Sequence, residues 1–244
     1  MNLAIATPTY NEAKNIVKLI DAIDSVCPKH PDINFTILVI DDNSPDKTAD
    51  KAEYAGKNVK AKNLKIRVLR RNGKEGFGKA YIHGFNELLK GNFDYIMQMD
   101  ADLSHDPKYI NDFIKEAKSG TEFVVASRYI TGGDTPDWGL HRKILSRGGN
   151  IYTRMLLGSK ITDYTGGFNM FSTRLLKAID PDSIEATGYG FLIELKAKAL
   201  LMTKSSAQIP IIFKDRQHGQ SKIPRSTLVK NFILVPKLRR KLRG

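Results

Sequence analysis

The chain has 244 residues, of which 41% are hydrophobic and 27% charged, and its formal net charge is +13. This length is enough for one large domain or two small ones with a buried core. The positive excess favours an anionic partner such as nucleic acid, a membrane surface or a phosphate-bearing substrate. The single cysteine, Cys27, excludes an internal disulfide framework and is typical of a reducing compartment.

Short apolar runs alternate with helical patterns along the first half of the chain. Strands are predicted at 3–6, 35–40, 64–69, 95–99 and 122–127. Later, 163–171 is predicted to be a turn that leads into a short strand, and 207–213 a further strand. Helices are predicted within 11–27, from about 46, at the glycine-rich segment 72–85, which enters a helix, from 107, and over 141–157 and 188–202. Strands that are buried on both sides and separated by helices predict a mostly parallel sheet with helices on both faces, which is an α/β fold.

Polar side chains follow the strands at the point where each strand ends. The strand ends read TPTYNE (7–12), DDNSPD (41–46), RRNGKEG (70–76), DADLSHD (100–106) and SRYITGGD (127–134). Ligands of such sheets bind beyond the carboxyl ends of the strands. We therefore expect these residues to meet at one edge of the sheet and to form the functional site there.

Asp100 and Asp102 follow the apolar strand at 95–99. Alternate residues of a strand point the same way, so both carboxylates are expected on one side. Mg²⁺ is typically held by one or two carboxylates together with substrate phosphates. The alternative is a solvated strand end, with Asp106 as a helix N-cap. The position at the ligand edge favours the metal.

A second acidic pair, Asp41 and Asp42, ends the second predicted strand. An acid at this place can accept hydrogen bonds from a nucleotide ribose or base. The alternative is a local turn and helix cap, a role that Ser44 or Asp46 can fill. No G-x-G-x-x-G follows the first strand and no P-loop motif occurs, which disfavours a dinucleotide oxidoreductase and a P-loop nucleotidase.

Seven segments resemble, in the same order, those of dolichyl- or polyprenyl-phosphate mannosyltransferases. They are PTYNE (8–12), IDDNSPDKT (40–48), GKEGFGKA (73–80), MDADLSH (99–105), SRYITGG (127–133), TDYTGGF (162–168) and DRQHGQSK (215–222). The resemblance covers about residues 3 to 223. It implies an inverting nucleotide-sugar transferase of the GT-A fold, with GDP-mannose as donor, a polyprenyl (dolichyl-type) monophosphate as acceptor, and Mg²⁺ or Mn²⁺ as cofactor.

The resemblance also implies roles for individual residues. The nucleoside site would be lined by Pro8, Tyr10, Glu12, Ile40 and Asp42. Asp100 and Asp102 would bind the metal, with Ser104 as a further and weaker ligand, and Ala101 would contact the donor through its backbone. Arg128 and Arg142 would hold the acceptor phosphate beside a mobile loop, and Arg216 and Lys222 would grip the donor phosphates. Asp100, Asp102 and Arg128 form the expected catalytic set, whereas His105 and Glu194 are expected to be structural.

The last segment, 224–244, is predicted to be an amphipathic basic tail that follows a transferase domain at 1–223. Leu228, Phe232, Val235 and Leu242 fall near one helical face, and Pro236 is expected to kink or split the helix. Such a tail can lie on an anionic membrane surface, although it can equally pack on the domain. We expect a cytoplasmic protein held peripherally at the cytoplasmic face of a membrane, by this tail or by a membrane-anchored partner subunit, since no apolar run approaches the ~20 residues of a membrane span.

Two alternatives remain open from the sequence. The first is a transferase of the same fold that uses UDP-glucose or UDP-N-acetylglucosamine with a lipid-phosphate acceptor. The second is a basic nucleic-acid-binding protein, which the net charge alone permits. No recognition-helix or RNA-binding aromatic pattern occurs, and the acidic strand ends would repel a polyanion, so no nucleic-acid partner is expected.

Overall fold

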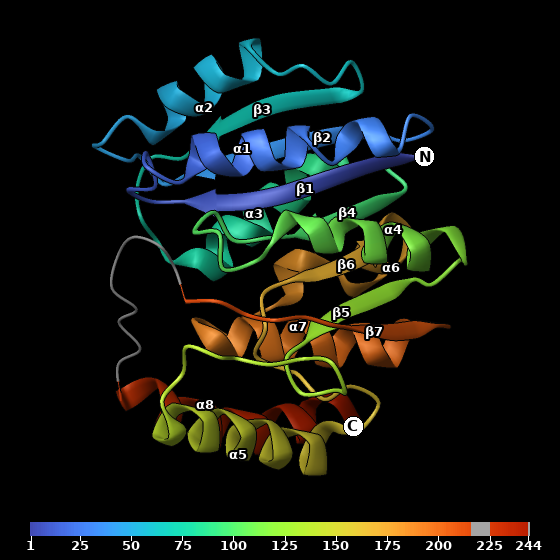
Figure 1. Ribbon diagram of the computed structural model, residues 1–244. Helices are drawn as coiled ribbons and strands as arrows, with labels where there is room; N and C mark the ends of the chain where they lie inside the picture. Colours follow the sequence, from blue (N-terminus) through green and yellow to red (C-terminus); the bar gives the residue numbers. More distant parts are fainter. Residues whose placement is uncertain (216–224, 244) are drawn as a thin grey trace.

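The computed structural model describes residues 1–215 and 225–243, and for 225–231 and 243 it describes only the backbone (Figure 1). Its strands form one sheet in the order β3-β2-β1-β4-β6-β5-β7. The strands are β1 (Asn2–Thr9), β2 (Asn34–Asp41), β3 (Leu64–Arg70), β4 (Tyr95–Gln98), β5 (Phe123–Ser127), β6 (Asn169–Ser172) and β7 (Ser206–Pro210). Every pairing is parallel except those of β6, which runs antiparallel to β4 and β5. The predicted mostly parallel α/β sheet is therefore confirmed.

Helices cover both faces of this sheet. They are α1 (Ile16–Asp24), α2 (Thr48–Lys57), α3 (Phe77–Leu89), α4 (Ile110–Lys118), α5 (Leu140–Leu157), α6 (Thr173–Ile179), α7 (Tyr189–Met202) and α8 (Arg225–Arg243), with 3₁₀ turns η1 (Cys27–Lys29), η2 (Pro107–Tyr109) and η3 (Pro181–Ser183). Leu3 and Ile5 of β1 pack with α1, α2 and α4, whereas Ala4 and Ala6 pack with α3, α6, α7 and α8. The alternation of side chains along β1 thus divides the core into two layers.

The predicted helix from 107 begins as the 3₁₀ turn η2 and continues as α4. The carboxylate of Asp106 accepts a hydrogen bond from the backbone N–H of Lys108 at 3.0 Å, so Asp106 is the N-cap that the sequence suggested. Pro107 occupies the first position of the turn, where its missing N–H is not needed. The acidic strand end and the start of α4 are therefore held in one short, fixed turn.

The C-terminal segment forms α8, which packs on α5 and α7 (Figure 1). This helix continues through Pro236 from 225 to 243, so the predicted split does not occur. Val235 and Leu238 are buried in the core, whereas Phe232, predicted on the same face, is 62% exposed. One side of the helix thus belongs to the core, and apolar side chains also remain on its outer side.

Candidate active site

A cavity of about 700 Å³ opens at the carboxyl ends of the central strands. It is lined by ten of the residues predicted from the sequence: Pro8, Tyr10, Glu12, Asp42, Asp100, Ala101, Asp102, Ser104, Arg128 and Arg142. Ile40 differs from the prediction, because its side chain is fully buried beneath Gly84 of α3 and belongs to the core. Arg216 and Lys222 lie outside the described residues.

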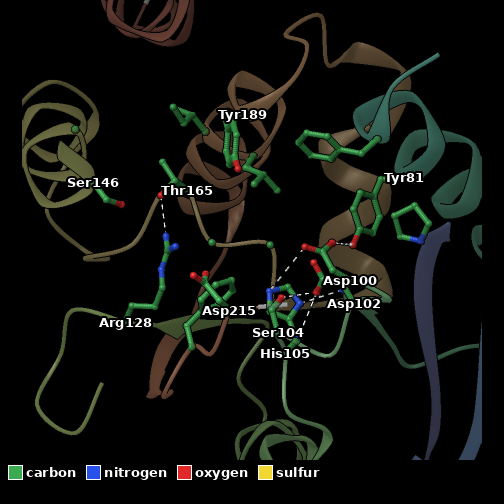
Figure 2. A pocket seen from close by; sticks show the side chains of 18 of the residues that line it. Tyr81, Asp100, Asp102, Ser104, His105, Arg128, Ser146, Thr165, Tyr189 and Asp215 are labelled. Atoms are coloured by element: carbon green, nitrogen blue, oxygen red, sulfur yellow. Dashed lines mark hydrogen bonds and ion pairs between the residues drawn. The ribbon is translucent and has the colours of Figure 1, made fainter. Parts of the chain in front are cut away.

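Asp100 and Asp102 lie in the turn that follows β4 (Figure 2). The Tyr81 hydroxyl donates to Oδ1 of Asp100 at 2.9 Å. Burial, followed by the charge of Asp100, raises the pKa of Tyr81 well above its ordinary value, so this hydroxyl stays protonated and remains a donor. Oδ1 of Asp102 accepts hydrogen bonds from the backbone N–H of Ser104 at 3.1 Å and from its hydroxyl at 2.6 Å. Hydrogen bonds thus hold both carboxylates in place.

His105 binds the backbone of Asp100. Its Nδ1 accepts the backbone N–H of Asp100 at 3.0 Å, so the proton of the neutral ring is on Nε2, which lies 3.9 Å from Oδ2 of Asp100. The ring is buried and stacks on Phe168 with centroids 4.9 Å apart. Burial lowers the pKa of His105, so the ring is neutral at physiological pH and does not neutralise the adjacent carboxylate.

The acidic pair has the donor chemistry of a divalent-metal site. Among the residues that the structure describes, no three or more His, Cys, Asp or Glu side chains group closely enough to hold a metal. Two aspartates at a cavity match the pattern of Mg²⁺, which takes its remaining ligands from phosphate and water. Gly167 faces the pair: a Cβ there would lie 3.3 Å from Oδ2 of Asp100. The absence of a side chain at this position leaves room beside the carboxylate.

On the β2 side of the acidic pair, the doubled acids after β2 have separate roles. Asp41 accepts from the Ser44 backbone N–H at 2.9 Å and from its hydroxyl at 2.6 Å, which is the local turn considered as the alternative. Asp42 lines the cavity and forms a buried ion pair with Arg71. Burial raises the pKa of Asp42 and Arg71 counteracts this rise. Arg71 was not predicted, although it stands at a strand end that the sequence marked as polar.

The ring of Tyr10 lies under the ammonium of Lys74, with Nζ 4.1 Å from the ring centroid. Both residues line the cavity, as does Asp42. Lys74 belongs to the glycine-containing loop between β3 and α3, and it was also missed. An aromatic face, an acid and a cation gathered at one end of a cavity suit a nucleoside.

Arg128 follows β5 and is held by Asp163 through two hydrogen bonds, Nε to Oδ2 at 2.7 Å and Nη2 to Oδ1 at 2.8 Å. Nη2 also donates to the hydroxyl of Thr165 at 2.8 Å (Figure 2). Burial alone would raise the pKa of Asp163, but the charge of Arg128 outweighs it and holds this pKa well below its usual range. The ion pair is therefore charged, and it presents Arg128 to the cavity in one orientation.

Arg142 of α5 stacks on Trp138, 3.9 Å from its ring, and its Nη1 donates to Oδ1 of Asp215 at 2.8 Å. Trp138 Nε1 donates to the same oxygen at 3.1 Å. Ser146, one turn further along α5, shares a 2.6 Å hydrogen bond with the Tyr129 hydroxyl and lines the cavity. Sequence reasoning missed four of these residues, because each has a partner that lies far away in the chain. They are Asp163, Trp138, Ser146 and Asp215.

The cavity continues from the two arginines into an apolar region between α5, α7 and α8. Its walls there include Leu145, Tyr152, Leu192, Ile193, Phe232 and Val235. The rings of Tyr152 and Phe232 stack with centroids 4.5 Å apart, and the Tyr152 hydroxyl donates to the Phe232 carbonyl at 2.9 Å. One cavity thus joins an acidic pair, two held guanidinium groups and an apolar end.

Comparison with known proteins identifies the family. The model of glycosyl transferase family 2 matches residues 4–180. The chain belongs to glycosyl transferase family 2. It is 34% identical to an undecaprenyl-phosphate mannosyltransferase of Micrococcus luteus over 91% of this chain and 88% of the relative. It is 33% identical to a polyprenol monophosphomannose synthase of Mycolicibacterium smegmatis, over 92% and 82% of the two chains. The resemblance noted from the motifs is confirmed.

Solved structures show the same fold for this glycosyltransferase. The crystal structure of mannosyl-3-phosphoglycerate synthase from Rubrobacter xylanophilus aligns with a TM-score of 0.70 at 21% identity, covering all of this chain and 74% of that one. Glucosyl-3-phosphoglycerate synthase from Mycobacterium tuberculosis, in complex with Mn²⁺ and UDP, aligns with a TM-score of 0.64 at 20% identity, over 97% and 78% of the two chains. The predicted GT-A architecture is confirmed.

Proposed function

We propose that this glycosyltransferase moves mannose from GDP-mannose to the phosphate of a polyprenyl (dolichyl-type) monophosphate, with inversion. One observation carries the proposal: a single cavity runs from the acidic pair, past Arg128 and Arg142, to an apolar end between α5, α7 and α8. The phosphate and the first isoprene units of a lipid acceptor match the arginines and the apolar end. The names of both curated relatives agree with this activity.

The chemistry of the acceptor explains which groups the site needs. A phosphate monoester has a second pKa near ~6, so its oxygen is already largely anionic at neutral pH. No strong general base is required, and the residues have to align the two substrates and stabilise their charges. Arg128 and Arg142 would orient the acceptor oxygen for attack on the anomeric carbon. A single displacement then forms the new bond on the opposite side of that carbon as the bond to the diphosphate breaks.

Asp100 and Asp102 would hold Mg²⁺ or Mn²⁺. Ser104 completes the protein side of this site, because its hydroxyl donates to Asp102 and still has lone pairs to offer. When bound, the ion would supply positive charge for the leaving diphosphate. Support comes from the donor set itself and from a protein of the same fold whose crystal structure contains Mn²⁺. Arg216 and Lys222 stay in the proposal as further phosphate ligands.

The nucleoside would lie among Pro8, Tyr10, Glu12 and Asp42 at the other end. Guanine is the base that the family resemblance implies, whereas UDP occurs in one structural neighbour. The test is incubation of the chain with GDP-mannose, UDP-glucose and UDP-N-acetylglucosamine, each with a polyprenyl phosphate, followed by mass spectrometry of the lipid. Only GDP-mannose should yield a hexosyl lipid phosphate. A product formed from the UDP sugars alone would contradict the proposal.

A lipid acceptor requires contact with a membrane. No helix that the structure describes is long and apolar enough to cross one. Helix α5 instead exposes an apolar stripe, defined here as Leu140, Ile144, Ile151 and Met155, which are spaced four, seven and four residues apart. Phe232 and Ile233 of the adjacent α8 are also exposed. Spacings of this kind place side chains on one side of a helix.

Basic residues accompany this apolar stripe. Helix α5 contains four Lys or Arg and no acidic residue, and α8 likewise lacks acidic residues. Each basic residue near an anionic bilayer contributes roughly 1 kcal/mol of attraction. We therefore include in the proposal peripheral binding through α5 and α8 at the cytoplasmic face, alone or beside a membrane-anchored partner subunit. Residues 1–223 would form the transferase domain, and 224–244 would add to the membrane-binding surface.

A further inference from the structure

Helix α7 buries three charged side chains, Glu194, Lys196 and Lys198. Two of them form hydrogen bonds with backbone groups of the segment that precedes the helix. Glu194 Oε2 accepts the backbone N–H groups of Glu185 at 3.1 Å and Ala186 at 2.8 Å, and Lys198 Nζ donates to the Ser183 carbonyl at 2.7 Å. These contacts give Glu194 and Lys198 structural roles. Lys196 does not contact this segment, and it has a different partner.

Lys196 is fully buried, and its Nζ donates to the backbone carbonyl of Asp163 at 2.7 Å. Within the described part of the chain, no carboxylate lies within ion-pair distance of this ammonium. Both carboxylate oxygens of Asp163 already bind Arg128. A buried ammonium with a neutral acceptor is costly, because burial removes its hydration. The position of this lysine therefore requires an explanation other than stability.

The charges around Lys196 do not balance. It faces Arg128 from the end of β5, Asp163 from the loop before β6, and His105 from the turn after β4, whose ring is neutral. Among the described residues, Lys196 and Arg128 thus share Asp163 as their nearby anion, while Asp100 and Asp102 lie beyond His105, next to the proposed acceptor end of the cavity. Burial lowers the pKa of Lys196 to about 7, with Asp163 opposing and Arg128 adding to the shift. An anion bound at Arg128 would compensate the excess charge.

The turn that begins at Asp163 links Lys196 and Arg128 to the acidic pair. Asp163 Oδ1 accepts the backbone N–H of Gly166 at 2.9 Å, which closes a tight turn. The turn ends at Gly167, opposite Asp100. By holding the Asp163 carbonyl, Lys196 braces the segment that orients Arg128 and borders the acidic pair.

We propose that Lys196 is a positioning residue for the acceptor: it holds the Asp163–Arg128 pair in place and supplies the buried positive charge that an anionic phosphate completes. This inference rests on the proposed function, because it takes the acceptor to be a phosphate monoester. Acceptor binding is then linked to the protonation of Lys196. The affinity for the acceptor falls as the pH rises above neutrality and Lys196 loses its proton, although the phosphate itself becomes more anionic.

The test compares the full-length chain with Lys196→Met, Lys196→Arg and the control Lys198→Met. The control removes another buried lysine of the same helix that binds away from the cavity. Binding of farnesyl monophosphate is measured by calorimetry at about pH 6.5 and about pH 8.5, values on either side of the pKa of Lys196. The KM for GDP-mannose and the melting temperature are measured in parallel.

Lys196→Met should weaken farnesyl monophosphate binding about tenfold at the lower pH, as expected for loss of a charged hydrogen-bond donor. The KM of this variant for GDP-mannose should stay unchanged. Its affinity for farnesyl monophosphate should no longer fall as the pH rises. Lys196→Arg should bind farnesyl monophosphate at both pH values, because a guanidinium does not lose its proton in this range. Lys198→Met should bind farnesyl monophosphate like the wild type, with any loss confined to melting temperature.

Three results would overturn the inference while leaving the proposed function intact. These are unchanged acceptor binding in Lys196→Met, an equal loss for donor and acceptor, or the wild-type fall with pH persisting in Lys196→Arg. If Lys196→Met fails to fold, the pH dependence of Lys196→Arg against the wild type decides alone. A wild-type chain that binds no farnesyl monophosphate would overturn the proposed function, and the inference with it.

Discussion

Arg128 and Asp163, 35 positions apart in the sequence, form a buried two-point ion pair beside the cavity. The side chain of Asp163 is fully buried and that of Arg128 is 7% exposed. Both partners are charged, because each favours the ionised form of the other. The pair therefore fixes Arg128 in the cavity wall and makes the proposed acceptor site depend on a residue that does not line the cavity.

Asp163→Asn should lower the free energy of unfolding by about 3 kcal/mol or more, because it leaves a buried guanidinium without its counter-charge. The pKa of Asp163 is depressed in the folded state, so its stabilising contribution is fully present above the unfolded pKa of about 3.9 and is lost as the pH falls below it. The difference in the free energy of unfolding between the wild type and Asp163→Asn should therefore become smaller in acid. Urea unfolding at several pH values measures it, and a constant difference would contradict the ionised pair.

Asp102→Asn should reduce mannosyl transfer at least about a hundredfold, since it removes a charged ligand from the proposed metal site. Asp106→Asn is the matched control: it lies in the same turn, and asparagine can still cap Lys108. Transfer of radiolabelled mannose to lipid measures both. Chelation of divalent ions should abolish wild-type transfer, and added Mn²⁺ or Mg²⁺ should restore it. Full activity in Asp102→Asn would rule out the metal role.

Gly167→Ala tests the space beside the acidic pair. Its Cβ would lie 3.3 Å from Asp100 Oδ2 and 3.4 Å from His105 Cε1, so one of these groups has to shift. We expect weaker activation by Mn²⁺, seen as a higher metal concentration for half-maximal transfer, with little change in melting temperature. Gly73→Ala is the control, because a Cβ there meets nothing within 4 Å. Equal metal dependence in the two variants would show that Asp100 tolerates the displacement.

Ile151→Glu combined with Met155→Glu places two charges on the apolar stripe of α5. Flotation with vesicles containing anionic phospholipid should fall about tenfold or more, because two apolar side chains of the contact are lost. Tyr54→Glu on α2, where Tyr54 is 71% exposed, is the control. Wild-type flotation should also weaken at high salt. If the double variant floats as well as the control, α5 is not the membrane-binding surface.

Much of the fold could be predicted from the sequence for a local reason. Apolar runs of strand length that alternate with helical patterns predict a mostly parallel sheet, and in such a sheet the polar strand ends necessarily meet at one edge. Asp100, Asp102 and Arg128 were therefore recognised as neighbours although their contacts were not. The antiparallel insertion of β6 between β4 and β5 was beyond this reasoning, since strand order depends on packing between distant segments.

The sequence by itself determined the alternation of elements, the acidic pair and the basic surplus, because these depend on residue type and near-neighbour spacing. Only the tertiary structure decided that Ile40 points into the core, that Asp163 holds Arg128, and that Lys196 is buried behind them. Burial and ion pairing depend on which distant residues the folded chain brings together. From the sequence alone, a lysine in a helical pattern is expected at the surface. Only the fold shows that Lys196 is buried away from water.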